Sequence, residues 1–260
     1  MASNLSSIGF AFTDAEEFQQ AMLAIAPETV ERVGCEVGDY AIWRSRTGAE
    51  IWFHLPMLGT EDDARDIAGL TPFYEGLGAV QIEVVERRKR PGDTDFEGLL
   101  SGNVGTADDA YPIVFEAIDF AAHVQQPLPF KAQARIVAFA RSLRAFADEK
   151  AYAADKEGPL GEIGLAPRAF ISLAAFSEDT GEQEQAETPD TSALLTGQVI
   201  EHRLQLNERT GNAFHWLLVE SLDATFDVVA DPDIVEGDII VGGTVEVAGV
   251  LIGRLIERAP

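Results

Sequence analysis

The first helical pattern in the chain lies within its first 30 residues. Phe18, Met22 and Ile25 recur at intervals of three and four, which is the spacing of one face of an α-helix. Thr13 and Glu16 stand three residues apart just before this face, as the two partners of a capping box do. The pattern therefore predicts one helix that begins near Thr13.

Most other apolar positions alternate with polar ones or form short runs bounded by turn residues, which is typical of β-strands. Residues 131–146 are ambiguous, because their Ala and Arg content favours a helix whereas a dense apolar run favours a buried strand. We expect a strand there, followed by a short helix at residues 148–155. The predicted strands span residues 8–12, 30–37, 40–44, 49–55, 77–88, 96–104, 111–120, 131–146, 169–176, 194–206, 212–220, 224–230, 236–240 and 243–256.

An acidic stretch divides the chain into two parts. Residues 177–190 contain six acidic side chains, no basic one and almost nothing apolar, so we expect a solvated linker. Because strands and helices do not alternate regularly, a doubly wound sheet is not expected. The predicted fold is a β-rich α+β arrangement, with a mixed α/β-sheet domain at 1–176 and a small barrel domain at 191–260.

Two resemblances concern the C-terminal part. Five short strands in about 65 residues, with the sequence GDII followed by GGTVEVAGVLIGRL, resemble the closing strands of OB-fold barrels. That resemblance implies an OB-like β-barrel but no particular ligand. The segments APRAFISLAAF, LLTGQVIE and TGNAFHWLLVESL, together with the linker, are similar to bacterial proteins built of two parts, and this likeness implies no activity.

The N-terminal part resembles a different family. The β-α-β-β-β order predicted for residues 8–55 is similar to one module of the glyoxalase-like (vicinal oxygen chelate) proteins. The resemblance implies a metal ligand on the first strand, and residues 8–12 offer none. A second β-α-β-β-β module is not evident in the sequence either.

Charge and composition limit the partners that we expect. The chain has 44 acidic and 19 basic side chains and a formal charge of −25, which repels nucleic acid and anionic lipid. One cysteine excludes a disulfide framework, and no apolar run is long enough to span a membrane. The N-terminus has no recognisable export signal. We therefore expect a cytoplasmic protein without a nucleic-acid or membrane partner.

Sequence motifs for catalysis or cofactor binding are absent. The four histidines show no metal-ligand spacing, and the chain has no nucleophile elbow, phosphate loop or dinucleotide-binding motif, so no metal or cofactor is predicted. Glu50 and His54 lie on one face of a predicted strand, and with Tyr74 they are the only candidates for a dispersed active site. Cys35 lies beside Glu36, which raises a thiol pKa, and we expect it to be a strand residue.

A basic run stands out in this acidic chain. Arg87, Arg88, Lys89 and Arg90 are consecutive and precede a predicted turn. They are expected to pair with nearby carboxylates at a solvated hairpin end. The alternative is a contact with an anion or with an acidic partner.

Two aromatic residues form the second candidate contact. Phe214 and Trp216 lie on one face of a predicted strand, where OB barrels stack bases or sugars. Packing in the core is the other interpretation. Residues 191–260 carry four arginines against eleven carboxylates, so exposed rings would suit a neutral ligand or a protein better than nucleic acid.

These observations favour a non-enzymatic binding or assembly protein that contacts a protein or a neutral small ligand, and they leave a homo-oligomer open. The alternative is an enzyme with a dispersed active site, such as a glyoxalase-like metal-dependent enzyme. A cleft that holds two of the candidates Glu50, His54 and Tyr74 would favour the enzyme. An exposed apolar sheet face would favour the assembly protein.

Overall fold

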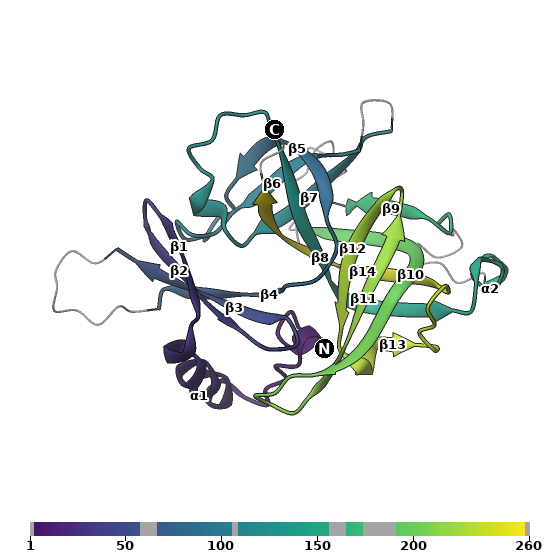
Figure 1. Cartoon of the computed structure of the whole chain (residues 1–260), viewed down its shortest axis with the longest axis horizontal. Coiled ribbons are helices and arrows are strands. Elements are labelled where there is room, and N and C mark those ends of the chain that lie inside the picture. The colour runs from purple at the N-terminus through teal and green to yellow at the C-terminus, as the bar shows by residue number, and fades with distance from the viewer. Residues whose placement is uncertain (1–2, 58–66, 106–108, 156–164, 174–190, 258–260) are drawn as a thin grey trace.

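The computed structural model of the chain describes residues 3–57, 67–105, 109–155, 165–173 and 191–257. These residues form a β-rich α+β fold, as the sequence predicts, and their strands are arranged in two sheets. Figure 1 shows the small sheet with the helix α1 beside it, and the curled strands of the large sheet next to both. No helix among the described residues is long and apolar enough to cross a membrane.

The small sheet is built from the N-terminal part of the chain. Its four strands are antiparallel and lie in sequence order, which short hairpin connections allow. Its edge strand β4 contains Pro72, a residue that an edge tolerates. The elements in this region are the 3-10 turn η1 (Ser6–Ile8), α1 (Ala15–Ile25), η2 (Ala26–Glu28), β1 (Glu31–Cys35), β2 (Gly38–Arg44), β3 (Ala49–Pro56) and β4 (Gly69–Tyr74).

The large sheet has ten strands and is organised around two long central ones. β8 and β14 pair antiparallel at thirteen positions, and each also pairs with strands on its other edge. Its strands and helical turns are β5 (Val80–Arg88), β6 (Leu99–Val104), β7 (Tyr111–Ala117), η3 (Phe120–Ala122), β8 (Phe130–Phe146), α2 (Glu149–Ala154), β9 (Ala169–Ser172), β10 (Ser192–Leu206), β11 (Ala213–Ser221), β12 (Ala224–Ala230), η5 (Pro232–Ile234), β13 (Val235–Glu236) and β14 (Thr244–Glu257).

The OB-like barrel predicted for residues 191–260 is not confirmed. β10, β11, β12 and β14 close a circuit of paired strands only by including β8, which lies in residues 130–146. β12 pairs with β8 in parallel and β14 pairs with it antiparallel, so both depend on a strand from the first part of the chain. The predicted linker, residues 177–190, lies outside the described residues, and the division into two domains stays a prediction.

Two apolar clusters hold the elements together. The first consists of side chains from the large sheet, including Leu217, Phe226 and Val247. The second lies between the small sheet and the outer face of the large one, and it includes Trp52 of β3 and Trp216 of β11. Burial of such large rings is a major source of stability, so the small sheet is fixed to the large sheet by a shared core.

The strand predicted at residues 8–12 is wrong. Gly9 has a left-handed backbone (φ +82°), and residues 10–12 have no regular secondary structure. The side chain of Asn207 donates to the Ile8 carbonyl (2.9 Å), and that of Thr210 donates to the Gly9 carbonyl (2.6 Å). These side chains from the β10–β11 turn bind the backbone carbonyls that a neighbouring strand would otherwise bind. Residues 8–56 therefore lack the predicted first strand.

Other expectations are confirmed with small shifts. The helix begins at Ala15, and its N-cap residue is Asp14 in place of the expected Thr13, because the Asp14 side chain accepts from the Glu17 amide (2.9 Å). Residues 130–146 form a strand, and a short helix follows at Glu149–Ala154. The sequence pattern missed β4, whose short run is interrupted by a proline.

Candidate functional site

Glu50 is fully buried and already has two donors. The Arg44 guanidinium binds one carboxylate oxygen, and Trp52 Nε1 donates to the other (2.7 Å). Burial raises the pKa of Glu50, while the bonds from Trp52 and Arg44 act in the opposite direction. The carboxylate is therefore held by neighbours on β2 and β3 and does not face a cleft.

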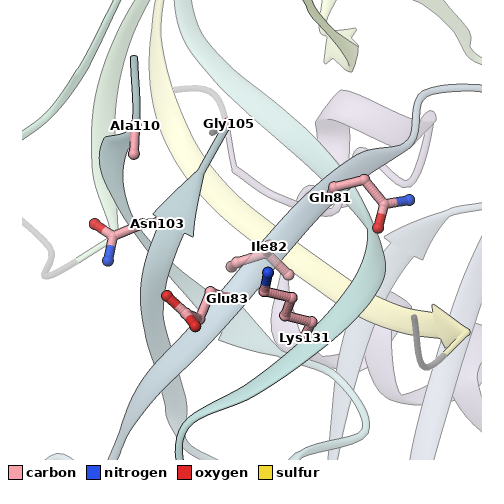
Figure 2. Close-up of a pocket in the computed structure, with 7 residues that line it drawn as sticks. All are labelled: Gln81, Ile82, Glu83, Asn103, Gly105, Ala110 and Lys131. Atoms are coloured by element: carbon pink, nitrogen blue, oxygen red, sulfur yellow. The ribbon is translucent and has the colours of Figure 1, made fainter. Parts of the chain in front are cut away.

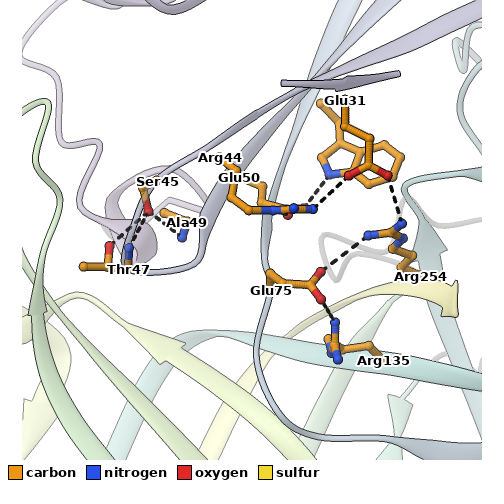
Figure 3. A network of polar contacts seen from close by, with 10 residues as sticks. Glu31, Arg44, Ser45, Thr47, Ala49, Glu50, Glu75, Arg135 and Arg254 are labelled. Carbon is orange, nitrogen blue, oxygen red and sulfur yellow. Dashed lines mark hydrogen bonds and ion pairs between the residues drawn. The ribbon is translucent and has the colours of Figure 1, made fainter. Parts of the chain in front are cut away.

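This ion pair belongs to a network between the two sheets, shown in Figure 3. Arg44 also reaches Glu31 on β1 (3.3 Å), and Arg254 on β14 lies between Glu31 (3.8 Å) and Glu75 (3.4 Å). Arg135 on β8 pairs with the same Glu75. With Glu50 included, three arginines face three glutamates, so the charges balance. The network therefore joins the sheets and leaves no excess charge for a ligand.

His54 lies on the same face of β3 as Glu50, with Trp52 between them. Its ring is 1% exposed, stacks on Phe96 (centroids 5.2 Å apart) and meets the Tyr40 ring edge-on (5.5 Å). Burial lowers its pKa to about 4. His54 is therefore a neutral imidazole enclosed by aromatic rings.

Tyr74, the third candidate, lies elsewhere. It pairs with Ala49 in the β3–β4 register, so its side chain projects to the opposite face of the sheet from Glu50. Its hydroxyl accepts a hydrogen bond from Gln205 Nε2 (2.6 Å), and its ring packs on Trp216. The structure therefore does not bring the three candidates into one site. Within the described residues no group of three or more His, Cys, Asp or Glu side chains could hold a metal ion.

Phe214 and Trp216 are buried, so the predicted ligand contact at these rings is corrected to core packing. They face the shared core between the sheets because the β10–β11 hairpin folds over the N-terminal segment. Trp216 Nε1 donates to the Asp227 carboxylate (2.8 Å), which also accepts from the backbone amides of Leu77 (3.0 Å) and Gly78 (2.9 Å). Burial raises the pKa of Asp227 despite these bonds. Asp227 thus attaches the segment after β4 to β11.

The basic run at the end of β5 has partners within the chain. Arg87 donates to the carbonyls of Val124 and Gln126, and Lys89 pairs with Asp95 (2.9 Å). Arg90 binds Asp93 (3.1 Å) and Glu116 (3.1 Å). These contacts fit the solvated hairpin end. A partner contact through Arg87, Arg88, Lys89 and Arg90 stays a prediction.

Cys35 is half-buried at the end of β1, and its thiol donates to the Gly38 carbonyl (3.2 Å). Burial is the main reason that its pKa is raised, and the charges of Asp39 and Glu36 raise it further. A thiol of this kind is a poor nucleophile at neutral pH.

Two hollows on the surface are lined by residues that the structure describes. The larger, about 770 Å³, runs over the outer face of β5, β6 and β8, where Glu83 lies directly between Asn103 and Lys131 (Figure 2). The smaller, about 410 Å³, is lined by Glu28, Val30, Trp43, Arg44, Arg46, Glu208 and Arg209. In the smaller hollow Arg44 and Arg209 are already paired with glutamates. Neither hollow contains a candidate that the sequence suggested for catalysis.

The most unusual surface feature is the free edge of β10. Residues 192–198 pair with β14 on one side of the strand, whereas residues 198–206 pair only with β11, on the other side. The β14 side ends where the Val199 backbone exchanges hydrogen bonds with Gly242 and Gly243. Among the described residues, nothing pairs with that side of residues 201–206. Leu204 and Leu206 on this strand are 60% and 59% exposed.

The hairpin determines which backbone groups point to the free side. The Asn207 amide donates to the Asn212 carbonyl (2.9 Å), so alternate residues from 205 backwards bond to β11. The N–H and C=O groups of His202, Leu204 and Leu206 then point away from β11. Sequence alternation predicted this strand but could not show that one side lacks a neighbour.

Comparisons with protein-family models, with curated proteins and with solved structures found no match to this chain.

Proposed function

We propose that this chain is a non-enzymatic assembly protein that pairs with a second copy of itself along the free edge of β10. The observation that carries the proposal is the edge at residues 201–206, with three N–H and three C=O groups directed outward and two exposed leucines. An unpaired edge of this length is a template for another strand. Natural edges usually carry protective charges or prolines. On this edge the two charged residues, Glu201 and Arg203, pair with each other, and the residues whose backbone groups point outward are His202, Leu204 and Leu206.

A second copy fits this edge through a two-fold axis at Leu204. Antiparallel pairing about that residue sets each Leu204 opposite its counterpart and each His202 opposite a Leu206. The outward groups then form about six hydrogen bonds between the chains. Arg203 lies opposite Gln205 in this register, so like charges do not meet. A register centred nearer to Val199 would collide with the start of β14.

The buried polar groups support an assembly role over catalysis. Glu50 is bound by Arg44 and Trp52, and His54 is enclosed by aromatic rings. Tyr74 projects to the other face of the sheet. A glyoxalase-like site would need metal ligands on a first strand that the fold lacks at residues 8–12.

Sedimentation velocity of the full chain tests the proposal. The wild type is expected to shift from 28.1 kDa towards twice that mass as its concentration rises. Leu204→Lys should remain monomeric, because it places two ammonium groups together at the axis. Leu23→Lys is the matched control, since Leu23 is 59% exposed and belongs to α1 and not to β10, and it should dimerise like the wild type.

Circular dichroism establishes that both variants are folded. A wild type that stays monomeric at every concentration contradicts the proposal. Equal dimerisation of Leu204→Lys and the wild type contradicts it as well.

A further inference from the structure

Two histidines form a pair on the β10–β11 hairpin. His202 lies opposite Leu217 and His215 lies opposite Leu204, so the two imidazoles are diagonal neighbours on one face. His202 Nε2 is 2.9 Å from His215 Nδ1, and the rings are inclined by only 23°. Both side chains are partly exposed. The pair is therefore accessible from solvent and already arranged nitrogen to nitrogen.

The hydrogen bond between the two imidazoles requires that at least one ring has a free nitrogen lone pair. A hydrogen bond between two imidazole nitrogens needs one ring as donor and the other as acceptor. Burial lowers the pKa of both rings, and a charge on His202 lowers that of His215 further. The neutral imidazole is the form that binds metal ions, so protons compete little for this pair.

The distance between the nitrogens matches one coordination geometry. Metal–nitrogen bonds of about 2.05 Å that meet at a right angle place the two nitrogens about 2.9 Å apart, and a tetrahedral angle places them about 3.3 Å apart. The observed 2.9 Å is the length of the hydrogen bond between the rings and equals the spacing that a right angle requires, so the two nitrogens need not move apart to hold an ion. Right angles between imidazole ligands are characteristic of square-planar copper(II) and nickel(II).

We propose that His202 and His215 form a two-imidazole site for copper(II) or nickel(II). The ion bonds to His202 Nε2 and His215 Nδ1. The proton of the donor ring moves from the nitrogen that binds the ion to the other nitrogen of the same ring, so both rings stay neutral and no proton is released. No cluster of three or more His, Cys, Asp or Glu side chains occurs in the described residues. Water or a donor atom from a bound molecule therefore fills the remaining positions.

The site is independent of the pairing of β10 edges. The ion uses the imidazole side chains, which stand on one face of the hairpin, whereas the edge uses the backbone groups of the strand. A monomeric protein would still bind the ion. A dimer that binds no ion would contradict only the metal proposal.

Isothermal titration of the full chain, without a histidine tag, with copper(II) or nickel(II) chloride tests this site. One ion should bind each chain, and His202→Gln or His215→Gln should weaken binding at least about tenfold, since each removes one of two ligands. The matched control is His123→Gln. His123 is also partly exposed, but it lies outside the β10–β11 hairpin and pairs with Asp119, four residues before it (3.0 Å). This variant should bind like the wild type.

Two further measurements separate this site from the many carboxylates of the chain. Excess magnesium should leave binding unchanged, because carboxylates hold magnesium and neutral imidazoles do not. The electron paramagnetic resonance spectrum of the copper complex should show two nitrogen ligands, which each glutamine variant reduces to one. Equal affinity of His202→Gln and the wild type, displacement by magnesium or a spectrum with oxygen ligands alone would overturn the proposal.

Discussion

Acidification should destabilise the protein through His54. Its pKa of about 4 lies well below the ordinary value of 6.5, so the unfolded chain binds a proton more readily than the folded one. The stability that the neutral ring gives is complete above pH 6.5 and is lost as the pH falls towards 4. Between pH 7 and pH 4.5 the loss from this one residue amounts to about 2 kcal/mol, since each unit of pKa difference corresponds to about 1.36 kcal/mol.

Urea unfolding of the wild type and of His54→Leu at the two pH values isolates this contribution. Leucine has a similar volume and fills the site between Phe96 and Tyr40 without a titrating nitrogen. The other acidic and basic groups titrate alike in both proteins, so the difference between their pH dependences belongs to His54. The wild type should lose about 2 kcal/mol more than the variant. Equal losses would refute the argument that burial holds the imidazole neutral.

Two further changes test how the parts of the fold depend on one another. Gly76→Ala should destabilise the protein by several kcal/mol, because a Cβ there would lie 2.0 Å from the buried Asp227 carboxylate. Thermal unfolding measures the loss, and an unchanged midpoint would contradict the attachment of this segment to β11. Residues 191–260 expressed alone should give a poorly dispersed amide spectrum, since β12 and β14 would both lack β8, whereas sharp, dispersed signals would support a separate C-terminal domain.

Local pattern was enough to predict most strands but not their partners. Alternation and turn residues predicted β3, β8, β11 and β12 closely, because these signals depend on neighbours in the sequence. The pairing of β8 with β14 joins residues about 100 to 120 positions apart, and nothing in either segment specifies the other. For the same reason the five predicted C-terminal strands suggested a barrel that omitted β8.

The candidate residues show the same limit. The alternation predicts that Glu50 and His54 lie on one face of a strand. It does not predict that Arg44 binds Glu50 or that Phe96 stacks on His54, because these two partners come from other parts of the chain. Phe214 and Trp216 are buried because the N-terminal segment and Tyr74 pack against β11. The pairing of His202 with His215 depends on the hairpin register, which the sequence shows only once the turn is placed.

The charge of the chain determines how the proposed dimer responds to salt. About six hydrogen bonds between the edges contribute about 3–9 kcal/mol in all, which is comparable with the cost of association. Two chains that each carry −25 therefore pair weakly, and their mutual repulsion decides the balance. Because the screening length falls from about 8 Å at physiological salt to about 3 Å at 1 M, added salt should shift the wild type towards the dimer.

A basic protein partner would respond to salt in the opposite direction, since screening would weaken its attraction to the acidic chain. Salt titration in the centrifuge therefore distinguishes edge pairing between two copies from attraction by charge. Dimerisation that weakens with salt would mean that ion pairs, and not the backbone edge of β10, hold the two chains together.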